Sequence, residues 1–568
     1  MSRLLLQNEN MGAESFRILQ KSLARRAALY QVDIADESDP TAYIKTDAFH
    51  NVSLPHSGDA AYLIRVRRNP AFDEGRYALY PGANEAELVA SGDAALHAAL
   101  GRFLTESRFD GNGTFSPPTS VIDFTPARRI RGMYFATHFG NFYQNAPLER
   151  VEEILEDLAA EGCNSVLVWY DMHHFADITD PASEALIARL RAIIGYANCI
   201  GMGGSLTMLA NESFNTSPVA LRASSAIQNG YFAKPEAHYG VELCPSVPGG
   251  MEEILRQRRL VLSRFADLKI DYICYWPYDQ GGCTCAECAP WGVGGFLKIL
   301  PAFQQLTAEM LPHTKIILST WYFDRFVPGE WEGLYKKITA GELPGIEYIL
   351  SFFFGGEMPA VLRENGVPEG IKFIDFPEIS MYSCRPWGGF GANPLPRFWE
   401  ITNCRSGHLY SGAFPYSEGI FEDVNKYITL HTTDGQFVHA EDAVHAYVKT
   451  YFCTGDESLT RAILDTEVAL IRSARHDGTA QTYEICDKSL VRGTYETFCH
   501  FDEHLPAPIR ASARWRMLFI RAALDYELVT HEDHLLSSPR AQELLTELST
   551  IYAVGANTSR GVKPPLGI

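Results

Sequence analysis

The sequence lacks the long apolar runs of a membrane protein. None of its apolar runs reaches the roughly 18 consecutive residues that cross a bilayer, and the short run near the start gives way to Gln, Asn and Glu, so we expect no secretory signal. Of the 568 residues, 46% are hydrophobic and 21% are charged, which excludes a largely disordered chain. We expect a cytoplasmic globular protein with several domains.

Basic residues are comparatively scarce. The 49 lysines and arginines face 69 aspartates and glutamates, which leaves a formal net charge of −20. A field of this sign repels phosphate backbones and anionic lipids. We therefore expect neither nucleic acids nor membrane surfaces as partners.

The signatures of several enzyme classes are also absent. Gly201, Gly203 and Gly204 do not follow the G-x-G-x-x-G order, and the chain contains neither a P-loop nor a G-x-S-x-G elbow. Dinucleotide chemistry and phosphoryl transfer are therefore poorly supported.

Residues 1–127 predict an N-terminal α+β domain. Strand-like segments at 61–68 and 76–90 follow a helical opening and precede a helical run at 92–104. The polar, proline-containing stretch 110–129 is typical of an exit linker.

Residues 128–422 alternate strand-like and helical segments. A helix predicted from Pro147 to Gly162 illustrates the pattern, because its apolar residues recur at helical spacing. Eight buried strands alternating with helices are the requirement of a (β/α)₈ TIM barrel, an α/β fold. The eight segments are 131–136, 164–171, 204–209, 271–276, 315–322, 347–354, 371–376 and 407–414.

Residues 423–568 show helical periodicity and no strand signal. They predict a C-terminal α-helical domain packed on the barrel. This tail is a candidate surface for homo-oligomer formation, although no heptad run marks such an interface.

Acidic and aromatic residues follow the predicted barrel strands. Active sites of this fold lie at the carboxyl ends of the strands. Because aromatic rings stack on sugars and carboxylates bind hydroxyls or transfer protons, the set favours a carbohydrate site over other small-molecule chemistry. Its members are Trp169, Asp171, Glu212, Trp276, Trp321, Glu378, Trp387, Tyr416 and Glu418.

Structural roles remain open for some of these residues. Asp171 and Glu212 could cap the following helices, and Glu378 could form a salt bridge at the barrel rim. His173 and His174 are expected to support the site or to be solvated, and not to act as ligands.

Three stretches of the barrel resemble the family 20 β-N-acetylhexosaminidases. Arg131-Gly132-Met133 through His138-Phe139 resembles the Arg-Gly start of that family's barrel. Trp169-Tyr170-Asp171 resembles its next block, and Tyr416-Ser417-Glu418 resembles its Trp-x-Glu end. The resemblance implies exo-hydrolysis of a terminal β-linked N-acetylhexosamine, GlcNAc or GalNAc, by substrate-assisted retaining catalysis, with no cofactor required.

The same resemblance implies roles for single residues. Arg131 would bind hydroxyls of the terminal sugar, and Glu418 would accept hydrogen bonds from its far edge. At strand 4 the family carries an Asp-Glu pair, in which the Asp orients the substrate's acetamide and the Glu protonates the glycosidic oxygen. Here the pair is Asp279-Gln280, and a glutamine cannot donate a catalytic proton.

This departure leaves three assignments of the acid open. In the first, Asp279 is the acid while Tyr278 or Gln280 holds the acetamide. In the second, Glu378 is the acid and Asp279 orients the acetamide. In the third, Asp279 and Glu378 form an ordinary acid/base pair whose separation sets inversion or retention.

Two other families share features with this chain. The domain order also resembles the family 67 α-glucuronidases, and the tract 276–292 resembles the PND-G…C-x-C-x-x-C tract of family 163 endo-β-N-acetylglucosaminidases. An α-glucuronidase-like exo-hydrolase would need a cation for the uronate, for example Arg325 or Arg385. A non-catalytic carbohydrate-binding protein is a third class of function.

The twelve cysteines are scattered except for Cys283, Cys285 and Cys288. Three thiols at C-x-C-x-x-C spacing, with Cys244 as one candidate fourth ligand, predict a structural zinc site as one option. Buried free thiols and a disulfide are the other two.

Overall fold

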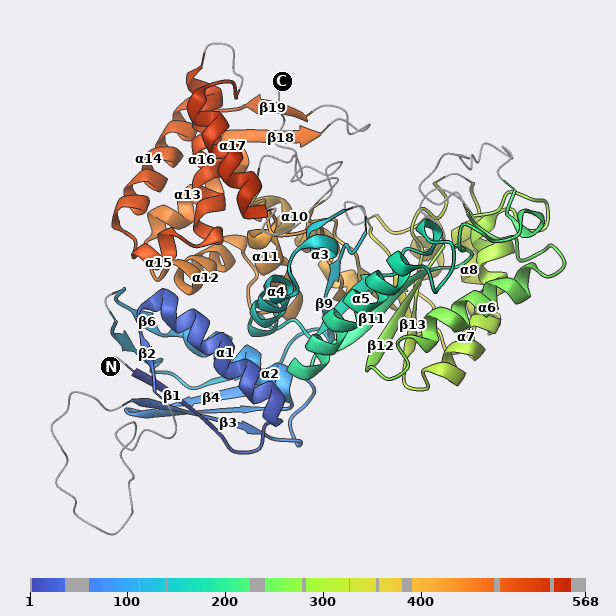
Figure 1. Cartoon of the computed structure of the whole chain (residues 1–568), viewed down its shortest axis with the longest axis horizontal. Coiled ribbons are helices and arrows are strands. Elements are labelled where there is room, and N and C mark those ends of the chain that lie inside the picture. The colour runs from blue at the N-terminus through green and yellow to red at the C-terminus, as the bar shows by residue number, and fades with distance from the viewer. Residues whose placement is uncertain are drawn as a thin grey trace, which may run out of the picture.

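The computed structural model describes residues 3–35, 61–111, 113–138, 140–224, 241–277, 282–325, 327–353, 357–380, 391–474, 481–531 and 536–552. Figure 1 shows an N-terminal α+β domain in blue, a barrel in cyan to yellow, and C-terminal helices in orange and red. Among the described residues, no helix is long and apolar enough to cross a membrane.

The N-terminal domain is a six-stranded sheet with two long helices on one face. Its strand order is β2-β1-β3-β5-β4-β8. The bounds are β1 Arg3–Asn8, α1 Ala13–Tyr30, β2 Asp33–Ile34, β3 Tyr62–Arg68, β4 Tyr77–Pro81, β5 Glu85–Ala90, α2 Asp93–Glu106 and β8 Ile122–Phe124, with a small hairpin of β6 Arg108–Phe109 and β7 Phe115–Ser116.

Two expectations for this domain need correction. The expected helical opening is present as α1, but strand β1 precedes it. This strand was missed because Leu4, Leu5 and Leu6 are all buried, and a strand buried on both faces has no alternating pattern. The stretch expected to be only a linker contains β8, which pairs with β4 at the sheet edge.

The barrel is a closed ring of eight parallel strands. Pairing of β16 with β9, and of β9 with β10, closes it, which confirms the predicted (β/α)₈ fold. The strands are β9 Ile130–Phe135, β10 Ser165–Trp169, β11 Gly203–Leu209, β12 Ile270–Trp276, β13 Lys315–Ser319, β14 Tyr348–Leu350, β15 Lys372–Asp375 and β16 Tyr410–Ala413, and the short β17 Tyr416–Ser417 pairs with the end of β9.

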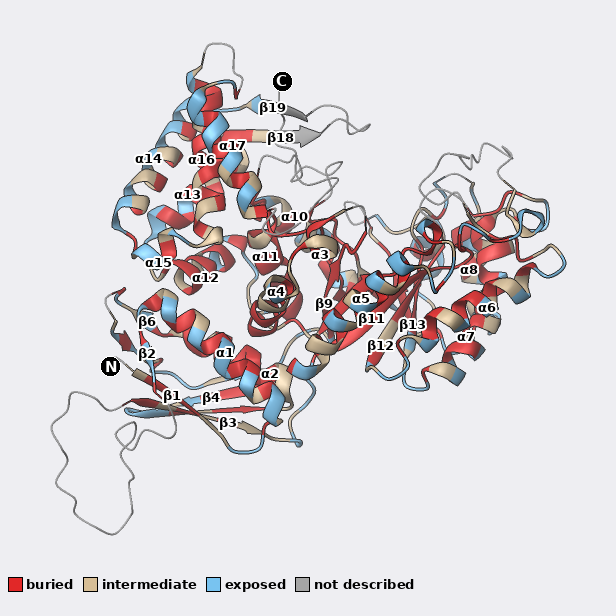
Figure 2. Ribbon diagram, viewed as in Figure 1, coloured by how far each residue is buried: buried red, intermediate tan, exposed pale blue. Residues whose placement is uncertain are grey.

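Helices surround the strands. They are α3 Phe142–Asn145, α4 Leu148–Ala160, α5 Pro181–Ile200, α6 Gly250–Ser263, α7 Leu297–Met310, α8 Glu330–Thr339, α9 Ala360–Asn365 and α10 Pro396–Ser406, with short helical turns η1 Met172–His174, η2 Val219–Leu221, η3 Gly292–Phe296 and η5 Gly407–Leu409. In Figure 2 the barrel strands are red, which marks buried residues, and the outer faces of the helices are largely pale blue, which marks exposed ones.

The Arg131-Gly132 pair, which follows the first residue of β9, has a packing explanation. A Cβ on Gly132 would lie 2.2 Å from the ring of Phe414, so only glycine leaves room for that ring inside the barrel. Phe414 belongs to an apolar core that fills the barrel interior together with Tyr134 and Trp276.

The C-terminal part consists of helices and one hairpin. The helices are α11 Asp423–Asp434, α12 Ala440–Phe452, α13 Glu457–Ala469, α14 Lys488–His504, α15 Ala507–Arg510, α16 Ala513–Thr530 and α17 Pro539–Tyr552. The hairpin of β18 Leu470–Ala474 and β19 Gln481–Ile485 corrects the expectation of helices alone, because β18 continues the apolar pattern of α13 directly. The helical class of this region is confirmed.

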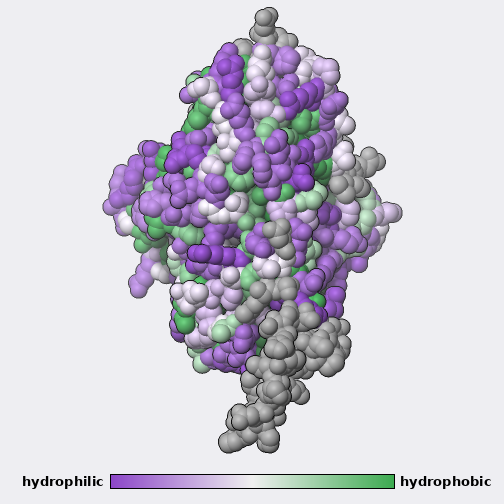
Figure 3. Space-filling model, turned by 90° about the vertical axis from the view of Figure 1, so that its left-hand side faces the viewer, coloured by the Kyte–Doolittle hydropathy of each residue, from purple (hydrophilic) through white to green (hydrophobic). Residues whose placement is uncertain are grey.

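Glu161, at the end of α4, joins all three parts. Its carboxylate lies 3.2 Å from Arg26 Nη2 of α1, accepts from the Tyr451 hydroxyl of α12 at 2.6 Å, and is 2.9 Å from His431 Nε2 of α11. The two flanking parts are therefore anchored on the same barrel helix, on the side of the barrel where Figure 1 shows them stacked. On the face seen in Figure 3, hydrophilic residues predominate and hydrophobic ones are interspersed.

Candidate active site

An aromatic wall lies at the carboxyl end of the barrel, where Trp321 is partly exposed and the other rings belong to the buried core of the barrel interior. The ring of Trp276, at the end of β12, lies 5.6 Å from Trp321 and 5.2 Å from Phe376, and Phe376 lies 5.9 Å from Tyr416. These residues follow four different strands. The structure therefore brings Trp276, Trp321 and Tyr416 together as predicted.

His138 extends the aromatic wall toward β10. Its ring packs edge-on against Trp169 at 4.5 Å, and its Nε2 is 3.5 Å from the hydroxyl of Tyr134. Sequence analysis assigned no role to His138 or Phe376. Both follow strand ends, so the rule that identified the tryptophans would also have found them.

Hydrogen bonds hold Glu418 beside Tyr416. The Tyr416 hydroxyl donates to Glu418 Oε1 at 3.1 Å. Ser380, which follows β15, connects its loop to the segment after β16. Its hydroxyl accepts from Glu418 N at 3.1 Å and donates to Tyr416 O at 3.2 Å. Burial first, and then above all the negative charge of Glu418, raise the pKa of Tyr416 well above its usual value. Glu418 is therefore held against the Tyr416 phenol, and Glu378 is buried after the neighbouring strand β15.

The C-terminal helices reach this rim. The hydroxyl of Tyr552, on α17, donates to the backbone oxygen of Glu418 at 3.3 Å, and its ring packs against Phe142 and Phe421. The position of the Glu418 loop thus depends on the last described helix.

A second group of charged residues, the acid–histidine cluster, follows β10 and β11. It consists of Asp171, His173, His174 and Glu212. His173 Nδ1 lies 2.7 Å from Glu212 Oε1, to which it donates, and 2.8 Å from Asp171 Oδ1, while His174 Nε2 lies 3.1 Å from Asp171 Oδ2. Asp171 and Glu212 are almost fully buried.

The charges within the acid–histidine cluster depend on each other. Burial lowers the pKa of His173, but hydrogen bonds and attraction from Asp171 and Glu212 outweigh it and raise that pKa to about 10. The histidines hold the pKa of Asp171 below its usual range despite burial, whereas burial raises the pKa of Glu212. His173 is thus a buried cation between two carboxyl groups.

Among the described residues, neither Asp171 nor Glu212 is seen to cap the helix that follows its own strand. The Asp171 side chain makes no cap hydrogen bond to the turn that follows it. Glu212 instead accepts from the ring Nδ1 and the backbone N–H of His173, in the turn after the neighbouring strand. A role of Asp171 in direct sugar binding stays a prediction, because both of its oxygens already face histidines.

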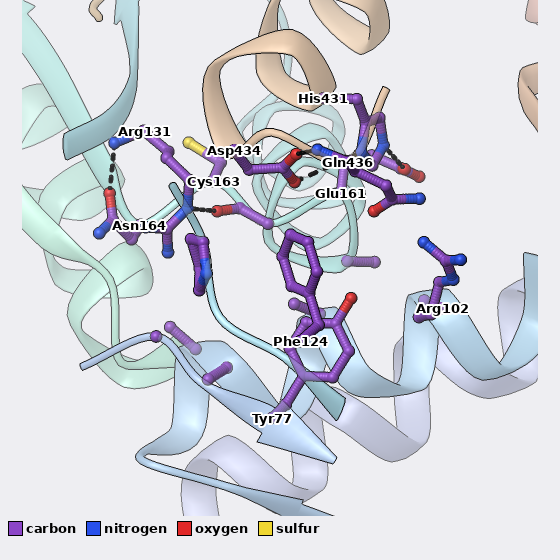
Figure 4. Close-up of a pocket in the computed structure, with 18 of the residues that line it drawn as sticks. Tyr77, Arg102, Phe124, Arg131, Glu161, Cys163, Asn164, His431, Asp434 and Gln436 are labelled. Carbon is purple, nitrogen blue, oxygen red and sulfur yellow. Dashed lines mark hydrogen bonds and ion pairs between the residues drawn. The ribbon is translucent and has the colours of Figure 1, made fainter. Parts of the chain in front are cut away.

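Arg131 lies at the wrong end of the barrel for the role that the resemblance implied. It is the second residue of β9, and its guanidinium donates to the backbone oxygens of Gly162 at 2.9 Å and Arg128 at 2.8 Å. Figure 4 shows Arg131 in the pocket between the N-terminal domain and the amino end of the barrel, with Asp434 and Asn164. The expectation that Arg131 binds a terminal sugar is therefore wrong, since the rim lies at the opposite end of the strand.

Several predicted residues lie outside the described part of the chain. They are Tyr278, Asp279, Gln280 and Trp387, and Arg385 with them. Trp291 contacts the described residues on either side of the segment that holds Tyr278, Asp279 and Gln280. Trp291 Nε1 donates to Pro277 O at 2.7 Å, and Gly282, with φ +94°, packs so closely on the Trp291 ring that a Cβ would lie 2.5 Å from it.

The cysteine cluster, defined as Cys244, Cys283, Cys285 and Cys288, lies next to the acid–histidine cluster. The ligand atoms of its four members all lie within 4.8 Å of one another. Hydrogen bonds, above all from Cys288, lower the pKa of Cys283 to about 5. Glu242, two residues before Cys244, was missed by sequence analysis. Burial, and then the nearby charges of Glu212 and Cys283, raise its pKa well above the usual value.

The sequence matches no family model and no curated protein. Solved structures match its fold. An inactive mutant of a family 20 exo-β-N-acetylglucosaminidase from Vibrio harveyi gives a TM-score of 0.52 at 13% identity, over 82% of this chain and 75% of that one. A family 20 chitobiase from Flavobacterium johnsoniae gives 0.50 at 12% identity, over 97% and 89% of the two chains. A family 89 glycoside hydrolase from Clostridium perfringens, solved with GlcNAc-α-1,4-galactose, gives 0.53 at 12% identity, over 86% and 62%.

These likenesses define the class of fold. The chain is a TIM barrel with flanking domains whose architecture resembles that of family 20 and related glycoside hydrolases, as the sequence predicted. One barrel architecture serves many chemistries, so function is argued from the site itself.

Proposed function

We propose that this protein is a glycoside hydrolase that releases a terminal β-linked N-acetylhexosamine, GlcNAc or GalNAc. The observation that carries the proposal is the aromatic wall of Trp276, Trp321 and Tyr416, with Glu418 hydrogen-bonded to Tyr416 and Glu378 following the neighbouring strand β15, at the rim where barrels of this kind hold their active sites. The fold likeness supports it by analogy.

The proposed mechanism gives each group one task. The tryptophans of the wall stack on the apolar face of the sugar ring, and Glu418 with Tyr416 binds its hydroxyls. A protonated carboxyl group donates its proton to the glycosidic oxygen while the substrate's acetamide oxygen attacks C1, and water then opens the resulting cyclic intermediate with retention. Gln280 cannot supply that proton, so the acid is Glu378 or Asp279. The reaction requires no cofactor.

Activity on matched aryl glycosides tests the proposal. We expect hydrolysis of the β-GlcNAc or β-GalNAc glycoside and none of the 2-hydroxy counterparts, because only a 2-acetamido group can act as the internal nucleophile. The assay compares turnover on these four substrates and on α- and β-glucuronides. Cleavage of a glucuronide would replace the proposal with an α-glucuronidase, and sugar binding without any turnover would replace it with a carbohydrate-binding protein.

The Trp321→Ala variant tests the wall. Trp321 is partly exposed at the rim, and an aromatic stacking contact is worth about 1 kcal/mol, so we expect KM to rise about fivefold with a smaller change in kcat. Steady-state kinetics on the best aryl substrate measure both. Trp321→Phe, which keeps a stacking face, should retain most of the affinity. An unchanged KM in the alanine variant would show that the sugar does not stack on Trp321.

A further inference from the structure

The cysteine cluster connects two neighbouring loops of the barrel rim. Cys244 lies between β11 and α6, whereas Cys283, Cys285 and Cys288 lie between β12 and η3. The Sγ of Cys244 is 3.8 Å from the Sγ atoms of both Cys285 and Cys288. Cys244, Cys283 and Cys288 are buried, and Cys285 is half-buried.

The spacing of the sulfur atoms matches tetrahedral zinc. A zinc ion bound by four thiolates at about 2.3 Å places neighbouring sulfurs about 3.8 Å apart. A disulfide would require about 2.05 Å between two of them. We propose that Cys244, Cys283, Cys285 and Cys288 bind one zinc ion as thiolates.

The surroundings of the cluster suit a charged metal–thiolate centre. The backbone N–H of Ser246 donates to Cys244 Sγ at 3.4 Å, and the Ser246 hydroxyl lies 3.2 Å from Cys288 Sγ. Lys298 Nζ donates to that hydroxyl at 3.0 Å and so brings a positive charge near the sulfurs. Polar groups of this kind around a metal orient its ligands and offset their charge.

The local backbone also prepares the ligands. The N–H groups of Cys288 and Ala289 both donate to the carbonyl oxygen of Cys285 at 3.0 Å. This turn directs Cys285 and Cys288 to the same side of the loop. Four protein ligands leave no open coordination position, so the zinc is structural and takes no part in the chemical step.

The proposed zinc would fix the strand-4 segment. Trp291 follows Cys288 by three residues and holds Pro277 and Gly282, the described residues on either side of 278–281. Binding of the metal would therefore restrain the ends of the segment that carries Asp279. This consequence rests on the proposed function, whereas the metal site itself does not.

Metal analysis of the full-length protein tests the inference. The protein is expressed with added zinc, purified without chelator and analysed for metal and for free thiols by elemental and intact-mass measurements. We expect about one zinc per chain, released when a mercurial reagent modifies the thiols. The Cys283→Ser and Cys288→Ser variants should lose most of it. Cys163→Ser, a buried cysteine outside the cluster, and Cys404→Ser, an exposed one, should keep it.

Cobalt substitution gives a readout that does not depend on the variants folding. Wild-type protein loaded with Co²⁺ should show thiolate-to-cobalt charge transfer and the d–d bands of a tetrahedral site. Four free thiols without metal, or a disulfide within the cluster, would overturn the proposal. A protein that binds zinc but cleaves no glycoside would refute only the proposed function, and an active protein that binds no zinc would refute only the metal site.

Discussion

The Glu378→Gln variant is expected to lose at least about a hundredfold in kcat, the usual contribution of a catalytic acid or base. The substitution keeps the size of the side chain but removes the proton that a carboxylic acid can donate. Glu378 is nearly buried at the rim and close enough to Tyr416 to raise its pKa. Steady-state kinetics on an aryl β-N-acetylhexosaminide measure the loss.

Comparing substrates with different leaving groups distinguishes a catalytic acid from a residue that only binds the substrate. A variant that lacks the acid should lose least on a substrate with a strongly acidic phenol, which departs without protonation, and most on an alkyl glycoside. Glu364→Gln, an exposed glutamate on α9, serves as the matched control and should behave like wild type. Near-normal turnover of Glu378→Gln on all substrates would remove Glu378 from the mechanism and assign the proton to Asp279, to be tested by the same series with Asp279→Asn.

Much of the barrel could be predicted from the sequence because its strands are short, apolar and followed by turns. The predicted segment 315–322 overlaps β13, which ends at Ser319. After Ser319 the chain enters a turn in which Tyr322 and Asp324 both adopt left-handed backbone conformations, with φ values of 62° and 61°. Aromatic residues after a strand carry the same apolar signal as the strand itself, so its end is not visible in the pattern.

Residues distant in sequence were harder to place. Glu378 and Glu418 could be found because both follow barrel strands, and that rule puts strand ends at one rim. Arg131 was assigned to the wrong end of the barrel, because a motif near the start of a strand does not show toward which end of the barrel its arginine side chain extends. Glu242 was missed because it follows no strand end and approaches Glu212 only through a loop bridge.

The largest expected change in stability comes from His173→Gln. In the wild-type protein His173 is the cation between Asp171 and Glu212, and both carboxyl groups are almost fully buried. Removing one partner from a buried ionic group costs about 3–5 kcal/mol, because the remaining charge is left uncompensated. For a domain of this size the midpoint of thermal unfolding should fall by roughly 10 °C. His174→Gln is the matched control: this neighbour is 55% exposed and makes one contact to Asp171, so its loss should cost less than about 1 kcal/mol.

The dependence on pH distinguishes lost charge pairing from lost packing. Because the pKa of His173 is raised to about 10, its stabilisation is complete below its ordinary value of 6.5 and is lost as pH rises through about 10. Because the pKa of Asp171 is lowered, its stabilisation is present above its ordinary value of 3.8 and is lost as pH falls below that value. Without His173, protonation of the two carboxyl groups relieves their repulsion. The difference in unfolding temperature between wild type and His173→Gln should therefore be largest near neutrality, decrease as pH falls below about 4 and shrink again above about pH 10. A difference that stays constant across this range would mean that the imidazole acts by packing alone.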